Sequence, residues 1–579
     1  MQRMRGVISD REIPDDAGIA IEFNIPLTSK RIDFIISGRD KNNIDSVVIV
    51  ELKQWEKCSA IENKDGVVST YVGGGIRTVT HPSYQALSYA KLIRDFNQTV
   101  QDDGINIAPC AFLHNYHITD DDPINSDYYA EYIEQAPMFG YDDVLKLRNF
   151  IKKYVVTGDN KEVLYRIENG KLRPSKMLQD TLASMLKGNQ EFLMIDEQKV
   201  IYEDAKLMAI EANKQQKKKV LVIEGGPGTG KTVVAINLLV ELINSGLTAF
   251  YVTKNAAPRS VFQEKLKGEF RKSYIDHLFK GSGSFVDSLP NEINCLIVDE
   301  SHRLQEKSGL FANKGENQIK EIIRTAEFSV FFIDETQKVT SKDIGSIELI
   351  KKIADELDAE YHIEYLTSQF RCNGSDGYLA WLDDVLDIRH TANFDFGDLD
   401  YEYDFKVFDD PNTMFDEVYK KNQINNKSRV VAGYCWNWIS DGKNNTDIYD
   451  IVIPEYDFRK SWNLANTSTW AIDEDSINEI GCIHTCQGLE FDYVGVIIGD
   501  DLRYENGYVI TDYSMRASTD NSLKGLVSKA KKGDLEAIKE TDIIIRNTYK
   551  TLMTRGMKGC YVYCVDKELG EYLRNKVKP

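Results

Sequence analysis

Alternating apolar and polar positions mark the first part of the chain. Over about residues 17–55 the segments AIEFNIPL, RIDFIIS and SVVIVELKQW alternate in this way, which is typical of half-buried strands. Helical patterns follow, including HPSYQALSYAKLIRDF, and strand-like segments alternate with helices up to about residue 155. This pattern predicts an α/β domain.

A different pattern begins at about residue 192, where short apolar runs are each followed by loop signals. The runs are VLVIEG, AFYVT, CLIVDE, SVFFIDE, RVVAGY, YVGVIIGD and GCYVYCVD. Continuous apolar runs are typical of strands that are buried on both faces, and their alternation with helices predicts mostly parallel, doubly wound sheets. We expect two such sheets. Residues 156–190 are polar and mixed, which indicates a connector with helical stretches.

Composition places these elements in a large globular protein. A chain of 579 residues with 42% hydrophobic and 28% charged residues has room for about three or four domains. The sequence shows no signal-peptide segment and no apolar run long enough to span a bilayer, so we expect no membrane partner. Nine cysteines without a CxxC pair favour a reduced, cytoplasmic location.

The net charge of the chain does not decide whether nucleic acid is a partner. A formal charge of −20 taken alone argues against a nucleic-acid partner. A large enzyme can nevertheless carry a local basic groove on an acidic body, so motifs have more weight than the total charge.

A phosphate-binding loop follows the strand-like run VLVIE and precedes the helical run VVAINLLVELI. Its glycines would aim backbone N–H groups at phosphate oxygens, while Lys231 would reach the β- and γ-phosphates and the Thr232 hydroxyl would ligate Mg²⁺. The predicted nucleotide-binding residues are Gly225, Gly226, Pro227, Gly228, Thr229, Gly230, Lys231 and Thr232.

Two further strand ends carry candidate ATPase residues. CLIVDESHR ends in Asp299 and Glu300, of which the first would hold Mg²⁺ and the second would orient the attacking water. FFIDETQ supplies Gln337, whose amide is placed to sense the γ-phosphate. An Asp–Glu pair after a strand is common by itself. Because a phosphate-binding loop lies upstream, these strand-end residues become specific candidates for the ATPase site.

Four more segments supply candidate residues around ATP. Arg371 in LTSQFRC and Arg555 in NTYKTLMTRG are two arginines that a second domain would deliver to the γ-phosphate. IHTCQGLEFD contributes Gly488 and Glu490 to nucleotide binding, and Gln198 in FLMIDEQ is placed to bind the adenine edge.

Taken in order, GGPGTGKT, DESHR, DETQ, FRC, HTCQGLEFD and MTRG resemble the motifs of a superfamily 1 helicase. LTSQFRCNGSDGYLAWLDD, CQGLEFDYVGVIIG and YKTLMTRGMKGCYVYC narrow the resemblance to the Schlafen group III helicase-like type, over about residues 190–579. The resemblance implies two RecA-like parallel-sheet P-loop domains, at 191–350 and 351–579. ATP and Mg²⁺ would bind between them, and nucleic acid would cross their tops.

The N-terminal strands carry a second set of charged residues. Period-two alternation places Glu51 and Lys53 on one face of a strand, with Val50 and Leu52 on the other, and a turn could bring Asp33 alongside them. Two carboxylates can share a divalent metal, and a nearby lysine can position or deprotonate a water for attack on a phosphodiester.

Gln85 and Tyr89 lie four residues apart on a predicted helix, and hence on one face. The combination D…ExK…QxxxY resembles the RecB-like branch of PD-(D/E)xK nucleases. For residues 1–155 this resemblance implies a restriction-endonuclease-like mixed sheet, with Asp33 and Glu51 as ligands of Mg²⁺ or Mn²⁺ and Lys53 as the catalytic lysine.

The resemblance also implies an upstream acid, for which Glu22 and Glu12 are the candidates. The family's first helix is expected to be nearly absent, because the first strand begins so early. A cut of both strands would need two active sites, which suggests a homo-oligomer.

The combined prediction is a metal-dependent nuclease fused to an ATP-driven helicase-like motor that acts on nucleic acid, with DNA favoured. The resemblance to bacterial proteins implies defence against phage or plasmid. One alternative is an ATP-gated sensor of nucleic acid or a partner, which cuts without unwinding. RNA as substrate and a binding protein with an inactive nuclease fold also stay open.

Overall fold

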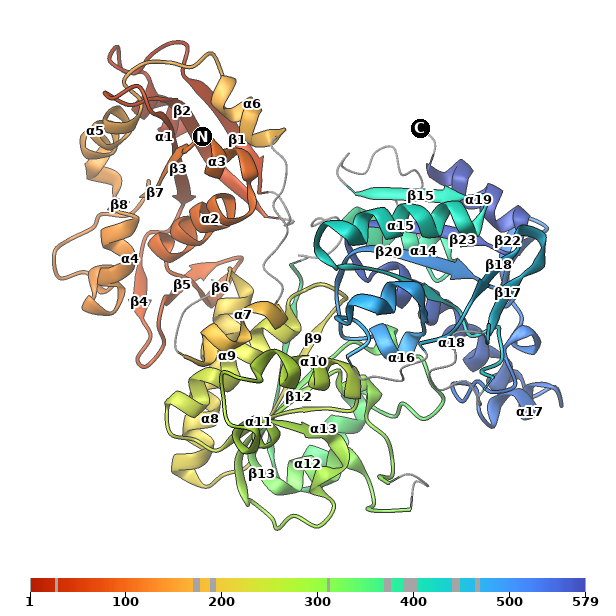
Figure 1. The fold of residues 1–579 in the computed structure, drawn as a ribbon. Helices are drawn as coiled ribbons and strands as arrows, with labels where there is room; N and C mark the ends of the chain where they lie inside the picture. Colours follow the sequence, from red (N-terminus) through yellow and green to blue (C-terminus); the bar gives the residue numbers. More distant parts are fainter. Residues whose placement is uncertain are drawn as a thin grey trace. The chain divides into compact units, whose positions relative to one another are not determined.

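The computed structural model describes residues 2–25, 30–169, 178–187, 194–309, 313–368, 376–389, 403–439, 448–463 and 469–577. The chain divides into two compact units (Figure 1). Unit 1 comprises Met1–Lys176 with Gln190–Leu207, and unit 2 comprises Met177–Asn189 with Met208–Pro579.

Unit 1 is built on a mixed sheet with the strand order β1-β2-β3-β7-β8. These strands are β1 (Gly18–Asn24), β2 (Arg31–Arg39), β3 (Asp45–Lys53), β7 (Asn106–Leu113) and β8 (Met138–Phe139). The first three strands pair antiparallel, whereas β3 with β7 and β7 with β8 pair parallel. The α/β class predicted for this part of the chain is therefore present.

Helices cover both faces of this sheet. They are α1 (Gln2–Ile8), α2 (Pro82–Phe96), α3 (Gln98–Asp102), α4 (Ala130–Gln135), α5 (Val144–Tyr154) and α6 (Glu162–Glu168). Val48 and Val50 of β3 pack in one apolar cluster with α1 and α5, while Val47 and Ile49 pack in another with α2, α3 and α6. The first helix, expected to be nearly absent, is thus a short helix packed on the sheet.

Two parts of unit 1 depart from the predicted organisation. A three-stranded antiparallel sheet of β4 (Cys58–Ala60), β5 (Val67–Val72) and β6 (Gly75–Thr80) lies in sequence between β3 and α2. The first residues of α8 (Glu197–Gln215), up to Leu207, belong to unit 1, although the sequence placed them in the ATPase half.

The first sheet of unit 2 has the order β11-β10-β12-β13-β9-β14, and all its strands pair parallel. The strands are β9 (Lys219–Gly225), β10 (Ala249–Thr253), β11 (Phe279–Gly281), β12 (Ile293–Asp299), β13 (Ala326–Ile333) and β14 (Glu360–Leu366). The sheet extends beyond the predicted boundary at residue 350, because β14 pairs with β9 along its whole length.

Helices of this part are α7 (Leu178–Leu186), α9 (Lys231–Asn244), α10 (Ala256–Leu266), α11 (Lys272–Leu278), α12 (Gln318–Thr325) and α13 (Ile347–Glu356). Buried residues of α12 and α13 pack with Val222 and Leu296 in one cluster, and α9 contacts β10 and β12. The phosphate-binding loop joins β9 to α9.

The second sheet of unit 2 has the order β15-β23-β20-β16-β19, again with parallel pairing throughout. Its strands are β15 (Asp404–Phe408), β16 (Ser428–Ala432), β19 (Ile480–Gly481), β20 (Phe491–Ile498) and β23 (Gly556–Cys564). Its helices are α14 (Asp376–Val385), α15 (Pro411–Asn425), α16 (Ile483–Cys486), α17 (Leu526–Ala530), α18 (Leu535–Met553) and α19 (Lys567–Val577).

Both faces of this sheet are covered, because α14, α18 and α19 share one apolar cluster with it and α15 shares another. Two short antiparallel pairs complete the unit, namely β17 (Ile451–Ile453) with β18 (Phe458–Lys460) and β21 (Leu502–Glu505) with β22 (Tyr508–Thr511). The prediction of two parallel, doubly wound sheets is confirmed.

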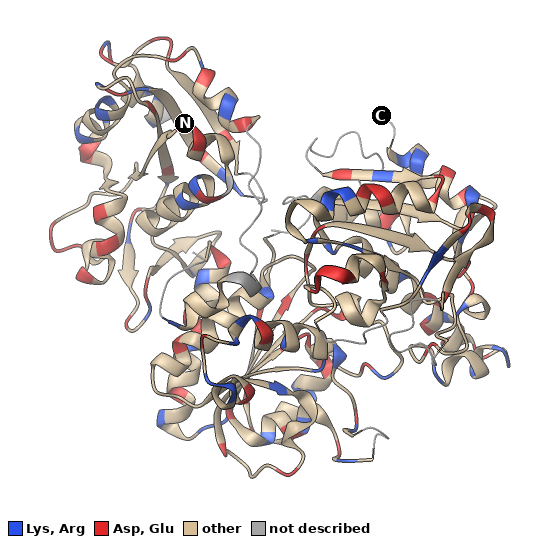
Figure 2. Ribbon diagram, in the orientation of Figure 1, with Lys and Arg blue, Asp and Glu red and all other residues tan. Residues whose placement is uncertain are grey.

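Charged residues of both signs are interspersed on the elements of each unit (Figure 2). Charge alone therefore does not mark a nucleic-acid surface among the residues that the structure describes. Within the same residues, no helix is long and apolar enough to cross a membrane.

Candidate functional site

The phosphate-binding loop has the backbone that its glycines predict. Gly228 and Gly230 adopt φ angles of +79° and +80°, which side-chain-bearing residues rarely adopt. Lys231 is the first residue of α9, and its Nζ donates to the carbonyl oxygens of Gly225 at 2.6 Å and Gly226 at 2.7 Å. The Lys231 ammonium group thus lies within the loop. It is next to the N-terminal end of α9, where the helix dipole attracts phosphate.

Asp299 lies at the C-terminal end of β12, beside the loop. Its Oδ2 accepts hydrogen bonds from the hydroxyls of Thr232 at 2.8 Å and Tyr251 at 2.6 Å. Burial, and then the neighbouring charge of Glu300, raise the pKa of Asp299 above its ordinary value. The structure brings together the two residues predicted to hold Mg²⁺ and adds Tyr251, which no motif identified.

Tyr251 is expected to set the orientation of Asp299 for Mg²⁺. Because Tyr251→Phe removes one hydrogen bond and leaves the aromatic packing, we expect the variant to need about tenfold more Mg²⁺ for half-maximal ATP hydrolysis. The measurement is an Mg²⁺ titration of steady-state ATPase rate at saturating ATP. An unchanged titration curve would contradict the assigned role.

Glu300 adopts a left-handed backbone with a φ of +52°, and its N–H donates to Asp299 Oδ1 at 2.9 Å. Its Oε2 lies 3.2 Å from Nε2 of His302, which is fully buried. Burial lowers the pKa of His302 to about 3, so its imidazole is neutral. Backbone strain of this kind is typical of functional sites, and the Glu300 carboxylate faces His302.

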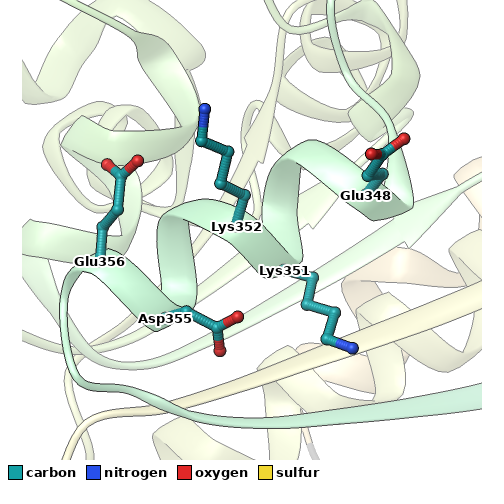
Figure 3. A pocket seen from close by; sticks show the side chains of 5 residues that line it. All are labelled: Glu348, Lys351, Lys352, Asp355 and Glu356. Atoms are coloured by element: carbon teal, nitrogen blue, oxygen red, sulfur yellow. The ribbon is translucent and has the colours of Figure 1, made fainter.

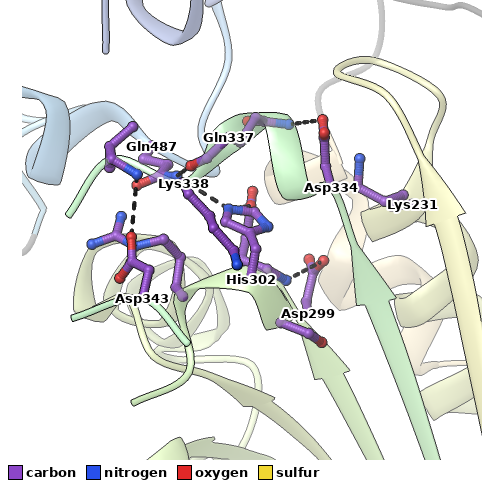
Figure 4. Close-up of polar contacts among 12 residues, drawn as sticks. Lys231, Asp299, His302, Asp334, Gln337, Lys338, Asp343 and Gln487 are labelled. Atoms are coloured by element: carbon purple, nitrogen blue, oxygen red, sulfur yellow. Dashed lines mark hydrogen bonds and ion pairs between the residues drawn. The ribbon is translucent and has the colours of Figure 1, made fainter. Parts of the chain in front are cut away.

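Gln337, in the single helical turn after β13, lies between Asp334 and Gln487 (Figure 4). Its Nε2 donates to Asp334 Oδ2 at 2.6 Å, and its Oε1 accepts from Nη2 of Arg555 at 3.1 Å. Burial opposes ionisation of Asp334, but the charge of Lys231 and two hydrogen bonds lower its pKa below the ordinary value. Residues from three motifs that are distant in the sequence therefore meet in one network.

Gln487 and Gly488 bring a further motif to the same place. The Gln487 side chain is buried and donates to the carbonyl oxygen of Gln337 at 3.2 Å. Gly488 has a φ of +82°, and a Cβ there would lie 2.8 Å from Pro258 Cγ and 3.5 Å from Glu300 Oε1. The close approach of this turn to α10, together with the positive φ, requires glycine.

Three further residues are predicted for the nucleotide site. Arg371 lies outside the described residues. Glu490 is half-buried just before β20. Gln198 is buried in unit 1, where its Oε1 lies 3.4 Å from the N–H of Ile195. Its role in adenine binding stays a prediction.

In unit 1, Glu51 and Lys53 share a face of β3, as predicted. Lys53 Nζ lies 2.7 Å from Glu51 Oε1, whereas Oε2 is buried without a hydrogen-bond partner among the described residues. Only 3% of Glu51 is exposed. Burial raises its pKa to about 7, with a contribution from Asp33 that Lys53 opposes. Asp33 lies alongside, since its Oδ2 accepts from the N–H of Leu52 at 2.8 Å.

Gln85 and Tyr89 point to one another on α2, because Gln85 Nε2 donates to the Tyr89 hydroxyl at 2.9 Å. That hydroxyl donates in turn to Oδ2 of Asp196 at 2.9 Å. Sequence reasoning missed Asp196, which precedes α8 in FLMIDEQ and has no fixed spacing from the other residues. Only the fold brings it to this site.

Neither candidate for the upstream acid is buried. The Glu22 side chain is 67% exposed and pairs with Arg31 at 3.1 Å, and that of Glu12 is 75% exposed and pairs with Lys152 at 2.5 Å. Glu22 nevertheless stands in the strand position opposite Asp33, since Ile21 pairs with Phe34 and Phe23 with Ile32.

A surface pocket on α13 is distinct from both sets of residues (Figure 3). It is lined by charged side chains alone, namely Glu348, Lys351, Lys352, Asp355 and Glu356. Acidic and basic residues four positions apart are typical of a solvated helix face. We therefore assign no function to it.

The family match to known proteins lies within unit 2. The family described as Schlafen group 3, DNA/RNA helicase domain, matches residues 218–566. An uncharacterized protein of Saccharomyces cerevisiae is 26% identical over 387 residues, which cover 61% of this chain and 83% of the yeast protein. The family match confirms the predicted helicase resemblance over these residues, and the predicted nuclease lies outside them.

Two solved structures show weak similarity. Bacteroides sp. Pif1 in complex with ADP-AlF4 has a TM-score of 0.25 at 11% identity, covering 64% of this chain and 96% of that chain. The Sulfolobus solfataricus SWI2/SNF2 ATPase core in complex with dsDNA has a TM-score of 0.21 at 10% identity, covering 64% and 87%. TM-scores this low do not establish a common architecture.

Proposed function

The chain belongs to the Schlafen group 3 DNA/RNA helicase-domain family and is a helicase-like ATPase, and from this premise we propose that it couples ATP hydrolysis on nucleic acid to metal-dependent cleavage of that nucleic acid. The observation that supports the motor best is the network of Gln337, Gln487 and Arg555, because it joins both parallel sheets beside the phosphate-binding loop. The observation that supports the nuclease best is buried Glu51 beside Lys53.

In the ATPase, each residue has a separate task. Lys231 neutralises charge on the transferred phosphoryl group, and Thr232 with Asp299 would hold Mg²⁺, which adds electrostatic stabilisation of the phosphates. Glu300 orients the attacking water. Arg555 contacts Gln337 from the second sheet, so a shift of that sheet would change the groups that face the γ-phosphate.

The residues of unit 1 fit a divalent metal. Glu51 presents a buried carboxylate oxygen without a partner among the described side chains, and burial of such an atom is costly unless a ligand satisfies it. Asp33 and Glu51 would hold Mg²⁺ or Mn²⁺, which supplies an activated water and stabilises charge on the phosphate. Lys53 would position that water or the scissile phosphate.

One observation favours the alternative of an ATP-gated sensor that cuts without unwinding. Between β20 and α18 the described chain forms only the short pair β21–β22, a single-turn helix and α17. The helicase resemblance implies a bulky insertion there in processive unwinding enzymes. The same active sites would then respond to binding rather than to strand separation.

Nucleic-acid stimulation separates these possibilities. The ATPase rate is measured with single-stranded DNA, duplex DNA and RNA, alongside displacement of a labelled strand from tailed duplexes. We expect DNA to stimulate hydrolysis most. Stimulation without displacement supports the gated sensor, and stimulation by RNA alone reassigns the substrate. A rate that no nucleic acid changes would contradict the proposed function of unit 2.

We also propose, from the resemblance alone, a cytoplasmic role in defence against phage or plasmid. Its test is an infection assay with cells that express the wild type or Lys53→Ala. Equal protection by the two proteins would contradict a defence role that depends on cleavage.

A further inference from the structure

We propose that Asp196 is a positioning residue of the nuclease site, where it strengthens binding of the divalent cation that Asp33 and Glu51 would hold. This inference rests on the proposed nuclease function. It adds to that site a carboxylate which follows Lys53 by more than a hundred residues and precedes α8.

Asp196 is held firmly in place. The preceding residues are fixed by a hydrogen bond of 2.7 Å from the Tyr84 hydroxyl to the carbonyl oxygen of Met194. Asp196 itself has a φ of +40°, and its carbonyl oxygen accepts from the N–H groups of Lys199 and Val200 at the start of α8. A side chain held in an uncommon backbone conformation is typical of a functional position.

The rest of the α8 start is anchored by ion pairs. Lys199 lies 3.0 Å from Asp65 and 2.8 Å from Glu203, and Lys64 pairs with Asp204. These partners come from the segment between β4 and β5 and from α8 itself, so the start of α8 has anchors other than the Asp196 carboxylate.

The side chain of Asp196 faces the site. Oδ2 accepts from the Tyr89 hydroxyl at 2.9 Å and lies 3.2 Å from Lys30 Nζ, whereas Oδ1 is buried without a hydrogen-bond partner among the described atoms. Through Tyr89 it reaches Gln85, the other residue of the helical pair. Asp196 thus fixes the position of a side chain that the nuclease resemblance places at the active site.

Charge at this site is unbalanced. Among the described residues, Asp33, Glu51 and Asp196 are three carboxylates at this site, where Lys53 pairs with Glu51 and Lys30 is shared between Asp196 and Glu197. Glu51, almost completely buried, also leaves Oε2 without a partner within the described part of the chain. An unpartnered buried carboxylate oxygen beside two further carboxylates favours a cation.

In this proposal Asp196 is not itself a ligand of the cation. In the described residues, no group of three or more His, Cys, Asp or Glu side chains is arranged to hold a metal ion. The ion would therefore be held by Asp33 and Glu51, and Asp196 would favour it through charge and through the fixed Tyr89. Residues that support metal ligands in this way typically change metal affinity by about 10–100-fold.

The test compares two charge-removing variants on the same segment. Asp196→Asn keeps the shape and an acceptor for Tyr89, but removes the charge near Glu51. Asp204→Asn removes the same charge eight residues further along, where the carboxylate pairs with Lys64. Mn²⁺ binding to the nucleotide-free full chain is measured by the electron paramagnetic resonance signal of free Mn²⁺, with Glu51→Gln as the reference for loss of the site.

We expect Asp196→Asn to weaken Mn²⁺ binding about tenfold, with unchanged melting temperature in the absence of metal and unchanged ATPase rate. Asp204→Asn should bind as the wild type does, because Lys199 still anchors the start of α8 through Asp65 and Glu203. If Glu51→Gln loses a Mn²⁺ site and Asp196→Asn binds normally, only the role of Asp196 is overturned. If Glu51→Gln itself loses no Mn²⁺, the proposed nuclease site fails, independently of Asp196.

Discussion

Lys231→Ala is expected to lower ATP hydrolysis about a thousandfold. The Lys231 ammonium group lies within the phosphate-binding loop, bonded to the carbonyl oxygens of Gly225 and Gly226, and is buried. A positive charge this close to the γ-phosphate stabilises the negative charge of the transition state, and alanine removes it. The measurement is release of inorganic phosphate at saturating ATP and Mg²⁺.

Lys217→Ala is the matched control for this variant. Lys217 precedes β9, its side chain is 57% exposed, and it pairs with Glu360 at 3.4 Å. Removal of this charge should leave the rate within about twofold, because exposed ion pairs contribute little. Hydrolysis by Lys231→Ala at the control's rate would contradict the assignment of the ATPase site.

Glu51→Gln should lower cleavage of nucleic acid about a hundredfold or more, while ATP hydrolysis stays within about twofold. The substitution keeps the size of the side chain and removes the charge that would bind the metal and pair with Lys53. The measurement is the initial rate at which a labelled substrate is cut in the presence of Mg²⁺ or Mn²⁺, with phosphate release measured in parallel.

Glu56→Gln is the control, because Glu56 is an exposed glutamate shortly after β3. It should cut at the rate of the wild type. Equal cutting by Glu51→Gln and the control would remove Glu51 from the active site. Loss of ATP hydrolysis together with cutting in Glu51→Gln would instead indicate a general folding defect, and the comparison would then be repeated with Lys53→Ala.

The sequence identified the parts of the fold whose residues follow local rules. Strands buried on both faces, such as VLVIE and CLIVDE, are continuous apolar runs, so both parallel sheets could be predicted. β14 was missed as part of the first sheet because YHIEYL is half-exposed and polar at an edge. Its assignment depends on its pairing with β9, which the sequence does not display.

Among the site residues, the motifs identified those with fixed spacing. Lys231, Thr232, Asp299 and Gln337 could all be predicted, and the structure brings them together. Tyr251 could not, since a tyrosine inside a strand is usually a core residue and only its hydroxyl contact with Asp299 reveals another role. Two other residues could not be predicted either, because only the fold brings them to their sites.

Those two residues are His302 and Asp196. His302 follows Glu300 in a common motif, but its neutral state results from complete burial, which the sequence cannot supply. Asp196 approaches Tyr89 because the start of α8 folds with unit 1. Contacts between distant segments of this kind depend on packing and not on any local pattern.

The central claim, that ATP hydrolysis and nucleic-acid cleavage are coupled in one protein, is tested most directly by one assay. Labelled single- and double-stranded DNA and RNA are incubated with wild type, Lys53→Ala and Lys231→Ala in Mg²⁺, with and without ATP. We predict that cutting disappears in Lys53→Ala and that ATP changes the cutting rate only when Lys231 is intact. A protein that hydrolyses ATP and cuts none of these polymers would contradict the claim.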